Sequence, residues 1–373
     1  MLEVNFPFEP PLGLRNRHSQ SLFSSSPVRR RVVQKHALDV KAAEQELTLD
    51  GGPDDEFPGG DGGRSGRVRL QAFWSRQTHL LPGDEAHPVA VLFHGWEGSA
   101  DSNYVLANAA RLWAEGFSVL RFNFRDHGDT HHLNPGLFHS CRLDEVIHGL
   151  RDWQGRCGIG RWNLCGYSLG GNFALRVAMR ARSEGLNLQS VVAVCPVINP
   201  AHAMRAMEEA GWIYERYFEL KWSRSLRRKK EIFPDLYGED DMDRIPGLNA
   251  RTDYIARKYS GFKGAADYYD GYSVGDGRLA GLEIPVTVLT ALDDPVIPAH
   301  DFEELQGLSN LDLRVSARGG HCGFLRNWRF ESAAENLIVE TFSLAPGEAS
   351  VAPEPAIQSG TRSPASSAAP GRS

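Results

Sequence analysis

Hydrophobic residues in the middle of the chain form short, nearly continuous runs, and segments of helical spacing separate them. Such apolar runs are typical of strands that are covered on both faces of a sheet. They lie at residues 88–93, 117–124, 161–165 and 190–195. Apolar positions three and four apart predict helices at residues 103–115, 142–154 and 172–181. This alternation predicts right-handed crossovers and a mostly parallel sheet flanked by helices.

The N-terminal region has a different pattern. We predict an irregular segment over residues 1–43, because Pro7, Pro10 and Pro11 are incompatible with a long helix there. Alternating positions then predict a strand pair at residues 44–50 and 67–74. Residues 51–66 between the two strands are rich in Gly, Pro and Asp, so we predict a solvated hairpin loop.

The alternation of strands and helices stops at residue 196. Residues 196–280 have helical and loop-like patterns with many aromatics, and we predict a helical cap or lid inserted into the core. The core would therefore comprise residues 1–195 and 281–344. Its second part is predicted to contain strands at 284–292 and 311–317 and helices at 300–307 and 328–343. We expect the Ala, Pro, Ser and Gly-rich tail, residues 345–373, to be disordered.

Composition narrows the functional class. The formal net charge is −6 and no basic stripe with interleaved aromatics occurs, which argues against nucleic-acid binding. Five cysteines without C-x-x-C spacing indicate free thiols in a reducing compartment. The N-terminus lacks the apolar run of a signal peptide, and no segment has the length of a membrane span. We therefore expect a cytoplasmic protein without an integral membrane segment.

The strongest chemical motif is G-Y-S-L-G at residues 166–170, between a predicted strand and a predicted helix. This is the G-x-S-x-G pattern of a nucleophile elbow, in which a sharp turn projects a serine hydroxyl clear of the sheet. Glycines two positions before and after Ser168 allow strand and helix to approach closely. Because short patterns occur by chance, the assignment depends on partner residues at the other strand ends.

An acid and a histidine follow Ser168 in the order expected for this type of site. Asp294 and His321 both follow predicted strands, so they lie at the edge of the sheet that carries Ser168. Histidine suits the role of base, and a carboxylate holds it in the required tautomer. We choose Asp294 over Asp293 because Pro295 fixes the turn directly after it.

Two backbone amides are the candidates for stabilising an oxyanion. One is that of Leu169, directly after the proposed nucleophile, and the other is that of Trp96, in the loop after the strand at 88–93. We expect neither a cofactor nor a metal ion in this chemistry.

Other polar clusters have simpler interpretations. Several residues near the end of the strand at 117–124 are potential metal ligands, but their spacing matches no zinc signature, so a polar loop is favoured. They are Asp126, His127, Asp129, His131 and His132. Cys322 has no separate base and is interpreted as structural or incidental. The basic run at residues 224–230 is interpreted as a solvated cap face, with binding of phosphates or anionic head groups as the alternative.

These motifs together resemble the α/β-hydrolase superfamily, and within it the YheT-like bacterial hydrolases and their eukaryotic relatives of the ABHD1 and ABHD3 type. The more specific signals are P-P-L-G-L-R-N-R-H-S-Q at 10–20, F-H-G-W-E-G-S at 93–99 and D-Y-Y at 267–269. The resemblance covers residues 6–343 and implies Ser168, Asp294 and His321 as a catalytic triad. It also implies hydrolysis of carboxylic or glycerolipid esters.

We therefore expect a serine esterase of the carboxylesterase or acylglycerol lipase type, acting on a small-molecule acyl ester with transient contact to lipid surfaces. An acyltransferase on the same fold is one alternative, because the choice of acceptor depends on the cap. A non-catalytic binding protein is the other, although that reading predicts a broken triad and every member is present. Acyl-chain preference and oligomeric state stay open.

Overall fold

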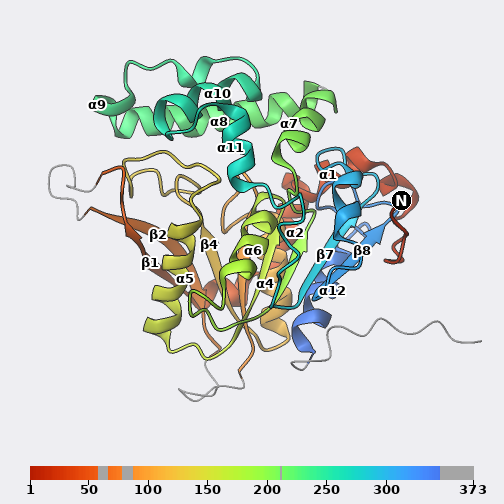
Figure 1. Ribbon diagram of the computed structural model, residues 1–373. Helices are drawn as coiled ribbons and strands as arrows, with labels where there is room; N and C mark the ends of the chain where they lie inside the picture. The colour runs from red at the N-terminus through yellow and green to blue at the C-terminus, as the bar shows by residue number, and fades with distance from the viewer. Residues whose placement is uncertain (58–65, 78–86, 211, 345–373) are drawn as a thin grey trace, which may run out of the picture.

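An eight-stranded sheet runs through the centre of the protein (Figure 1). The computed structural model describes residues 1–57, 66–77, 87–210 and 212–344. The strand order is β1-β2-β4-β3-β5-β6-β7-β8. The strands are β1 (Glu44–Pro53), β2 (Arg67–Ser75), β3 (Val89–Phe93), β4 (Ser118–Asn123), β5 (Trp162–Tyr167), β6 (Leu188–Val194), β7 (Val286–Ala291) and β8 (Leu311–Ser316). Only the β1–β2 and β2–β4 pairs are antiparallel among these strands, so the predicted mostly parallel sheet is confirmed.

Helices cover both faces of the sheet, and the alternating side chains of the strands feed two hydrophobic cores. On β3, Val91 and Phe93 pack with α5 (Leu143–Cys157) and α6 (Leu169–Arg180). The intervening Leu92 points to the opposite core. The helices on that side are α2 (Pro27–His36), α3 (Leu38–Ala42), α4 (Asn103–Ala114) and α12 (Ala333–Ser343). Burial on both faces explains why the strands read as continuous apolar runs.

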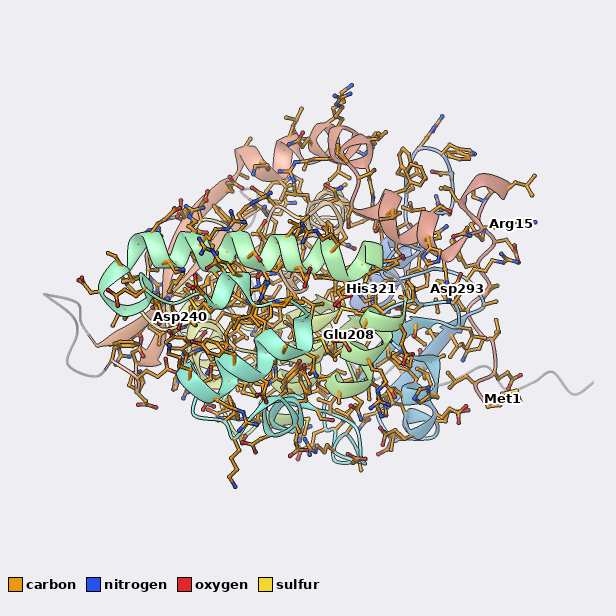
Figure 2. All side chains as sticks on the ribbon, turned by 90° about the horizontal axis from the view of Figure 1, so that it is seen from above. Met1, Arg15, Glu208, Asp240, Asp293 and His321 are labelled. Atoms are coloured by element: carbon orange, nitrogen blue, oxygen red, sulfur yellow. The ribbon has the colours of Figure 1, made fainter. Side chains whose placement is uncertain are left out.

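A layer of helices stands above the sheet, in the segment between β6 and β7 where we predict a cap (Figure 1). Its helices are α7 (Pro200–Glu209), α8 (Trp212–Ile232), α9 (Pro234–Tyr237), the 3₁₀ turn η2 (Met242–Arg244), α10 (Leu248–Tyr259) and α11 (Ala265–Tyr272). Seen from above, the long helix α8 crosses the molecule, with His321 beneath one end (Figure 2). Among the described residues, no helix combines the length and the apolar character needed to cross a bilayer.

The prediction of an irregular segment over residues 1–43 is wrong for most of its length. A 3₁₀ turn, η1 (Leu12–Leu14), leads into α1 (Arg17–Ser24), and α2 and α3 follow. Side chains of Asn16 and Ser26 cap the first two α-helices by accepting hydrogen bonds from backbone amides. Pro27 occupies the first turn of α2. A backbone N–H has no acceptor within the helix at this position, so the missing N–H of proline costs nothing, and its fixed backbone angle favours a helix start.

Several other elements differ from the sequence-based expectation. The last helix, α12, begins at Ala333 rather than near residue 328, and Phe330 before it has a left-handed backbone with φ 60°. The helix expected at 300–307 is a 3₁₀ helix, η3 (Ala299–Leu305). Strand β1 continues to Pro53, into the segment interpreted as a loop. Residues 58–65 of that loop and the tail at 345–373 lie outside the described residues.

Candidate active site

Ser168 occupies a sharp turn between β5 and α6. Its backbone has φ 54° and ψ −118°, a conformation that non-glycine residues rarely adopt. The turn is held from both sides, because the Ser168 amide donates to Val194 O at 2.9 Å and its carbonyl accepts from the Asn172 amide at 3.1 Å. Strain of this kind persists only where surrounding contacts determine it, and it clusters at functional sites.

The two glycines of the motif permit the close contacts around this turn. A Cβ atom at Gly166 would lie 2.1 Å from the Gly170 carbonyl oxygen. A Cβ at Gly170 would lie 2.3 Å from the His94 carbonyl oxygen, on the neighbouring strand end. Any side chain at either position would push strand and helix apart, so the pattern that identified the elbow has a direct steric cause.

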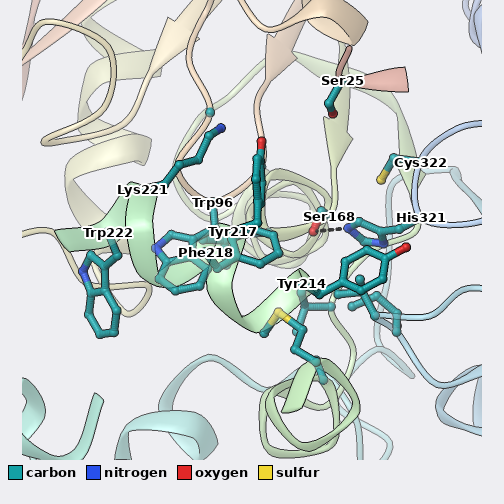
Figure 3. Close-up of a pocket in the computed structure, with 18 of the residues that line it drawn as sticks. Ser25, Trp96, Ser168, Tyr214, Tyr217, Phe218, Lys221, Trp222, His321 and Cys322 are labelled. Carbon is teal, nitrogen blue, oxygen red and sulfur yellow. Dashed lines mark hydrogen bonds between the residues drawn. The ribbon is translucent and has the colours of Figure 1, made fainter. Parts of the chain in front are cut away.

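The structure brings Ser168, His321 and Asp294 together although up to 153 positions separate them in sequence. His321 Nε2 lies 2.9 Å from Ser168 Oγ (Figure 3). On the other side of the ring, His321 Nδ1 lies 2.9 Å from Asp294 Oδ2. The other oxygen of Asp294 accepts hydrogen bonds from the amides of Val296 and Ile297. The carboxylate of Asp294 is therefore fixed by main-chain donors and aimed at the imidazole.

The neighbouring Asp293 has a different contact. Its Oδ1 accepts a hydrogen bond from the Gly320 amide at 2.9 Å, one residue before His321. Asp293 therefore holds the backbone of the histidine loop, whereas Asp294 contacts the imidazole ring. This geometry agrees with the choice of Asp294 over Asp293 as the residue paired with His321.

Electrostatics favour a proton on His321. Burial alone lowers the pKa of His321, but the negative charge of Asp294, together with the adjacent Cys322 and the hydrogen bonds to both, outweighs burial, so the pKa is raised well above its ordinary value. A raised pKa makes the imidazole a stronger proton acceptor when it is neutral. It also means that the imidazole is already protonated at moderately low pH and then accepts no proton from Ser168.

The loop after β3 packs directly against Ser168. A Cβ at Gly95 would lie 3.3 Å from Ser168 Cβ, and the Gly95 carbonyl accepts from the Gly98 amide to close a tight turn around Trp96. On the other side, Leu169 is the first residue of α6, and first-turn amides have no acceptor within their own helix. The structure thus places the segments that carry both predicted oxyanion donors beside Ser168.

Helix α1 supports the histidine loop, a role that the sequence patterns did not reveal. Ser21 Oγ accepts from the His321 amide at 2.9 Å. Buried Gln20 donates to Leu325 O and accepts from Leu325 N, at 3.1 and 2.7 Å. His18 Nδ1 lies 2.9 Å from the Tyr214 hydroxyl at the start of α8. The L-R-N-R-H-S-Q segment at 14–20 was the available signal, although its sequence alone gives no contact.

A cavity of about 510 Å³ opens above Ser168 and His321. One wall is aromatic: Trp96 stacks on Phe218 with ring centroids 5.2 Å apart, and Trp222 meets Trp96 edge-on (Figure 3). Two cap-segment helices supply much of the remaining wall: α7 contributes Met204 and Met207, and α8 contributes Tyr214, Tyr217 and Phe218.

The site geometry agrees with the outcome of a family comparison. The model of a family described as the alpha/beta hydrolase fold matches residues 88–327, more than half of the chain. The chain belongs to the α/β-hydrolase family. The resemblance seen in the motifs is therefore confirmed, and the mostly parallel sheet flanked by helices agrees with it.

Relatives of this α/β-hydrolase are distant in sequence. It is 24% identical over 351 residues to an abhydrolase domain-containing protein of Dictyostelium discoideum, covering 88% of this chain and 80% of that protein. It is 24% identical over 278 residues to Escherichia coli YheT, named as a candidate esterase, covering 69% and 80%. A serine hydrolase from Cycloclasticus zankles superposes with TM-score 0.50 at 19% identity, covering 80% and 98%, which shows the fold alone. The family match and the esterase-named relative support a hydrolase of esterase type.

The polar cluster at residues 126–132 binds helix α8 of this α/β-hydrolase. Lys229 is 1% exposed and donates to Asp126 Oδ1 at 2.6 Å, as well as to the carbonyls of His131, Asn134 and Gly136. His131 Nε2 lies 2.8 Å from Ser225 Oγ. The reading of the basic run at 224–230 as a solvated face is therefore wrong for Lys229, whose ammonium anchors α8 to the core.

Cys322 lies on the cavity wall beside His321, with the buried Cys195 next to it. Its amide donates to Cys195 Sγ at 3.4 Å. Burial raises the pKa of the Cys322 thiol, but hydrogen bonding with Cys195 and the adjacent His321 outweighs burial and brings it to about 6. The Cys322 thiol thus has polar neighbours that its sequence position did not indicate. Of the two residues, only Ser168 occupies the nucleophile elbow.

Proposed function

We propose that this protein is a serine hydrolase that cleaves carboxylic esters through an acyl-enzyme. The observation that carries the proposal is the chain of two 2.9 Å contacts from Ser168 Oγ through His321 to Asp294, at the floor of a largely apolar cavity. A serine hydroxyl is a weak nucleophile without a base within hydrogen-bond reach, and His321 is such a base. Names of distant relatives support the esterase class.

In the first step Ser168 Oγ attacks the ester carbonyl carbon while His321 Nε2 accepts its proton. The resulting imidazolium is stabilised by Asp294, whose second oxygen is held by main-chain amides. The negative charge that develops on the carbonyl oxygen is stabilised by the amides of Leu169 and Trp96. Collapse of this intermediate expels the alcohol, which takes the proton from His321.

In the second step water replaces the alcohol. His321 accepts a proton from water, the hydroxide attacks the acyl carbon, and the same two amides stabilise the second tetrahedral intermediate. Ser168 leaves with the proton returned by His321, and the free carboxylic acid is released. These steps use groups of the chain alone.

The cavity suits an ester with an apolar chain. Aromatic and methionine side chains from α7, α8 and the β3–α4 loop line the space above Ser168, including Trp96, Met204 and Phe218. Burial of each methylene of a ligand contributes about 0.8 kcal/mol, so such a wall favours acyl or alkyl chains over charged groups. We therefore propose carboxylic or acylglycerol esters as the substrate class.

A fluorophosphonate probe tests the proposal, because it phosphonylates an activated serine. We expect labelling of the wild-type protein and none of Ser168→Ala, with p-nitrophenyl butyrate turnover reduced on the order of 10⁶-fold in the variant. Labelling that persists in Ser168→Ala would place the nucleophile elsewhere. Adding alcohol acceptors to the same assay separates hydrolysis from acyl transfer, since transfer yields a new ester instead of acid.

A further inference from the structure

Two histidines and an aspartate from separate segments converge at the start of α7. His202 lies in the first turn of α7, whereas His300 and Asp301 lie at the start of η3. Asp301 Oδ1 is 2.6 Å from His202 Nδ1 and 3.3 Å from His300 Nε2. One ligand atom from each of the three residues lies within 4.8 Å of those of the other two.

Asp301 is a buried carboxyl group, and one of its two oxygens has no partner in the described part of the protein. Its side chain is only 3% exposed, and its Oδ2 atom is buried with no hydrogen-bond partner. Among the described residues, its ion-pair partners within 4.0 Å are the two histidines, and neither is a permanent cation. Burying a carboxylate without a counter-charge is costly, so this group calls for a cation.

We propose that His202, His300 and Asp301 bind a divalent transition-metal ion, with Zn²⁺ as the preferred ion. Two imidazole nitrogens and one carboxylate are a donor set that zinc uses with water as the fourth ligand. Mg²⁺ and Ca²⁺ prefer sites built from oxygen atoms, so the histidines select against them. The side chains of His202 and His300 are 39% and 67% exposed, which leaves a path for the ion from solvent.

The ion would join two segments that border the cavity. Helix α7 contributes Ala203, Met204 and Met207 to the cavity wall, and Val296 and Ile297, shortly before η3, line it from the core. A metal bond between His202 and Asp301 would replace a single hydrogen bond and fix the base of the cap to the core. The ion touches none of the reacting atoms, so this inference does not depend on the proposed hydrolysis.

Metal titration of the full, untagged chain after dialysis against EDTA tests the site. We expect one equivalent of Zn²⁺ to bind by calorimetry and to raise the melting temperature. His202→Ala and His300→Ala should each weaken binding by at least about 10-fold. His36→Ala, which removes an exposed histidine from α2, should leave the titration unchanged. Circular dichroism of each metal-free variant checks that it is folded.

A second group of potential ligands, Cys195, His321 and Cys322, requires its own control. Cys195→Ser removes one of its thiols and should not change the stoichiometry or the affinity. Co²⁺ bound to wild type should show ligand-field bands without the intense near-ultraviolet absorption that thiolate ligands produce. Absence of stoichiometric binding, binding unaffected by both histidine variants, or a thiolate spectrum would each overturn the proposal.

Discussion

Main-chain hydrogen bonds hold the floor of the cavity, whereas packed side chains form its roof. The floor comprises the loops after β3, β5, β7 and β8, where backbone amides fix the turn at Ser168 and the carboxylate of Asp294. The roof comprises α7 and α8, whose contact with the floor is exemplified by the stacked rings of Trp96 and Phe218. A fixed floor suits one reaction, whereas side chains in the roof can be exchanged to suit different substrates.

After the loss of Ser168 itself, the largest expected effect distinguishes the two aspartates of the floor. Asp294→Asn should lower kcat by about 10⁴-fold, because an amide cannot hold the required tautomer of His321 or stabilise its charged form. Asp293→Asn is the matched control, since its amide oxygen can still accept from the Gly320 amide. Turnover of a p-nitrophenyl ester measures both. A severe loss in Asp293→Asn with activity retained in Asp294→Asn would reverse their roles.

A smaller effect should separate roof from floor. Phe218→Ala removes the ring that stacks on Trp96, so kcat/KM for long-chain p-nitrophenyl esters should fall about 10- to 100-fold. The acetate ester, which does not reach the roof, should change by less than about threefold. Leu220→Ala, on an exposed position of the same helix, serves as control. Equal losses on short and long esters would contradict the division of roles.

Removing the hydrogen bond that α1 provides to the histidine loop should have a still smaller effect, and only on catalysis at the cavity floor. Ser21→Ala removes the acceptor for the His321 amide, and we expect kcat to fall about 10-fold with KM unchanged, because the imidazole is less well positioned. Ser21→Thr keeps the hydroxyl and should restore kcat. Ser19→Ala, on the same helix but bonded to Asn16, should have no effect. A rise in KM without loss of kcat would instead place Ser21 in substrate binding.

The pH profile gives the finest test of the floor. His321 must be neutral to accept a proton, so kcat/KM should fall as pH drops through its pKa. Because Asp294 raises that pKa, the acid limb of the wild type should lie above the ordinary histidine range. In Asp294→Asn the raising charge is gone, and the residual activity should have its acid limb at lower pH. An acid limb at the same pH in both proteins would show that another group titrates.

Much of the floor could be predicted because its constraints are local. Continuous apolar runs followed from burial on both faces, and the elbow glycines are required by contacts of 2.1 and 2.3 Å. Parallel strands bring their carboxyl ends to one edge, which is sufficient to bring Ser168, Asp294 and His321 together. The order serine, acid, histidine along the chain then indicated which residues at those strand ends form the triad.

The N-terminal helices were missed although the sequence contains local signals for them, because the early prolines were given more weight. Prolines early in the chain suggested irregular structure, whereas Asn16 and Ser26 are caps and Pro27 marks a helix start. The contacts of Gln20 and Ser21 with the histidine loop span about 300 positions. The anchor at Lys229 is likewise a long-range contact, and nothing in a run of basic residues indicates which one is buried.

Helix α8 is held to the rest of the protein near both of its ends. Near its start, Tyr214 is bonded to His18 of α1, and near its end Lys229 is sunk into four oxygen acceptors of the core. Because both ends of α8 are bonded to the core, we expect this helix to stay in place during turnover. Ester and acid would then enter and leave beside the helix. Leu22, half-exposed on α1, and Ser25 border the cavity and are candidates for this entrance. The N-terminal helices would then border the entrance to the cavity and also support the loop that carries His321.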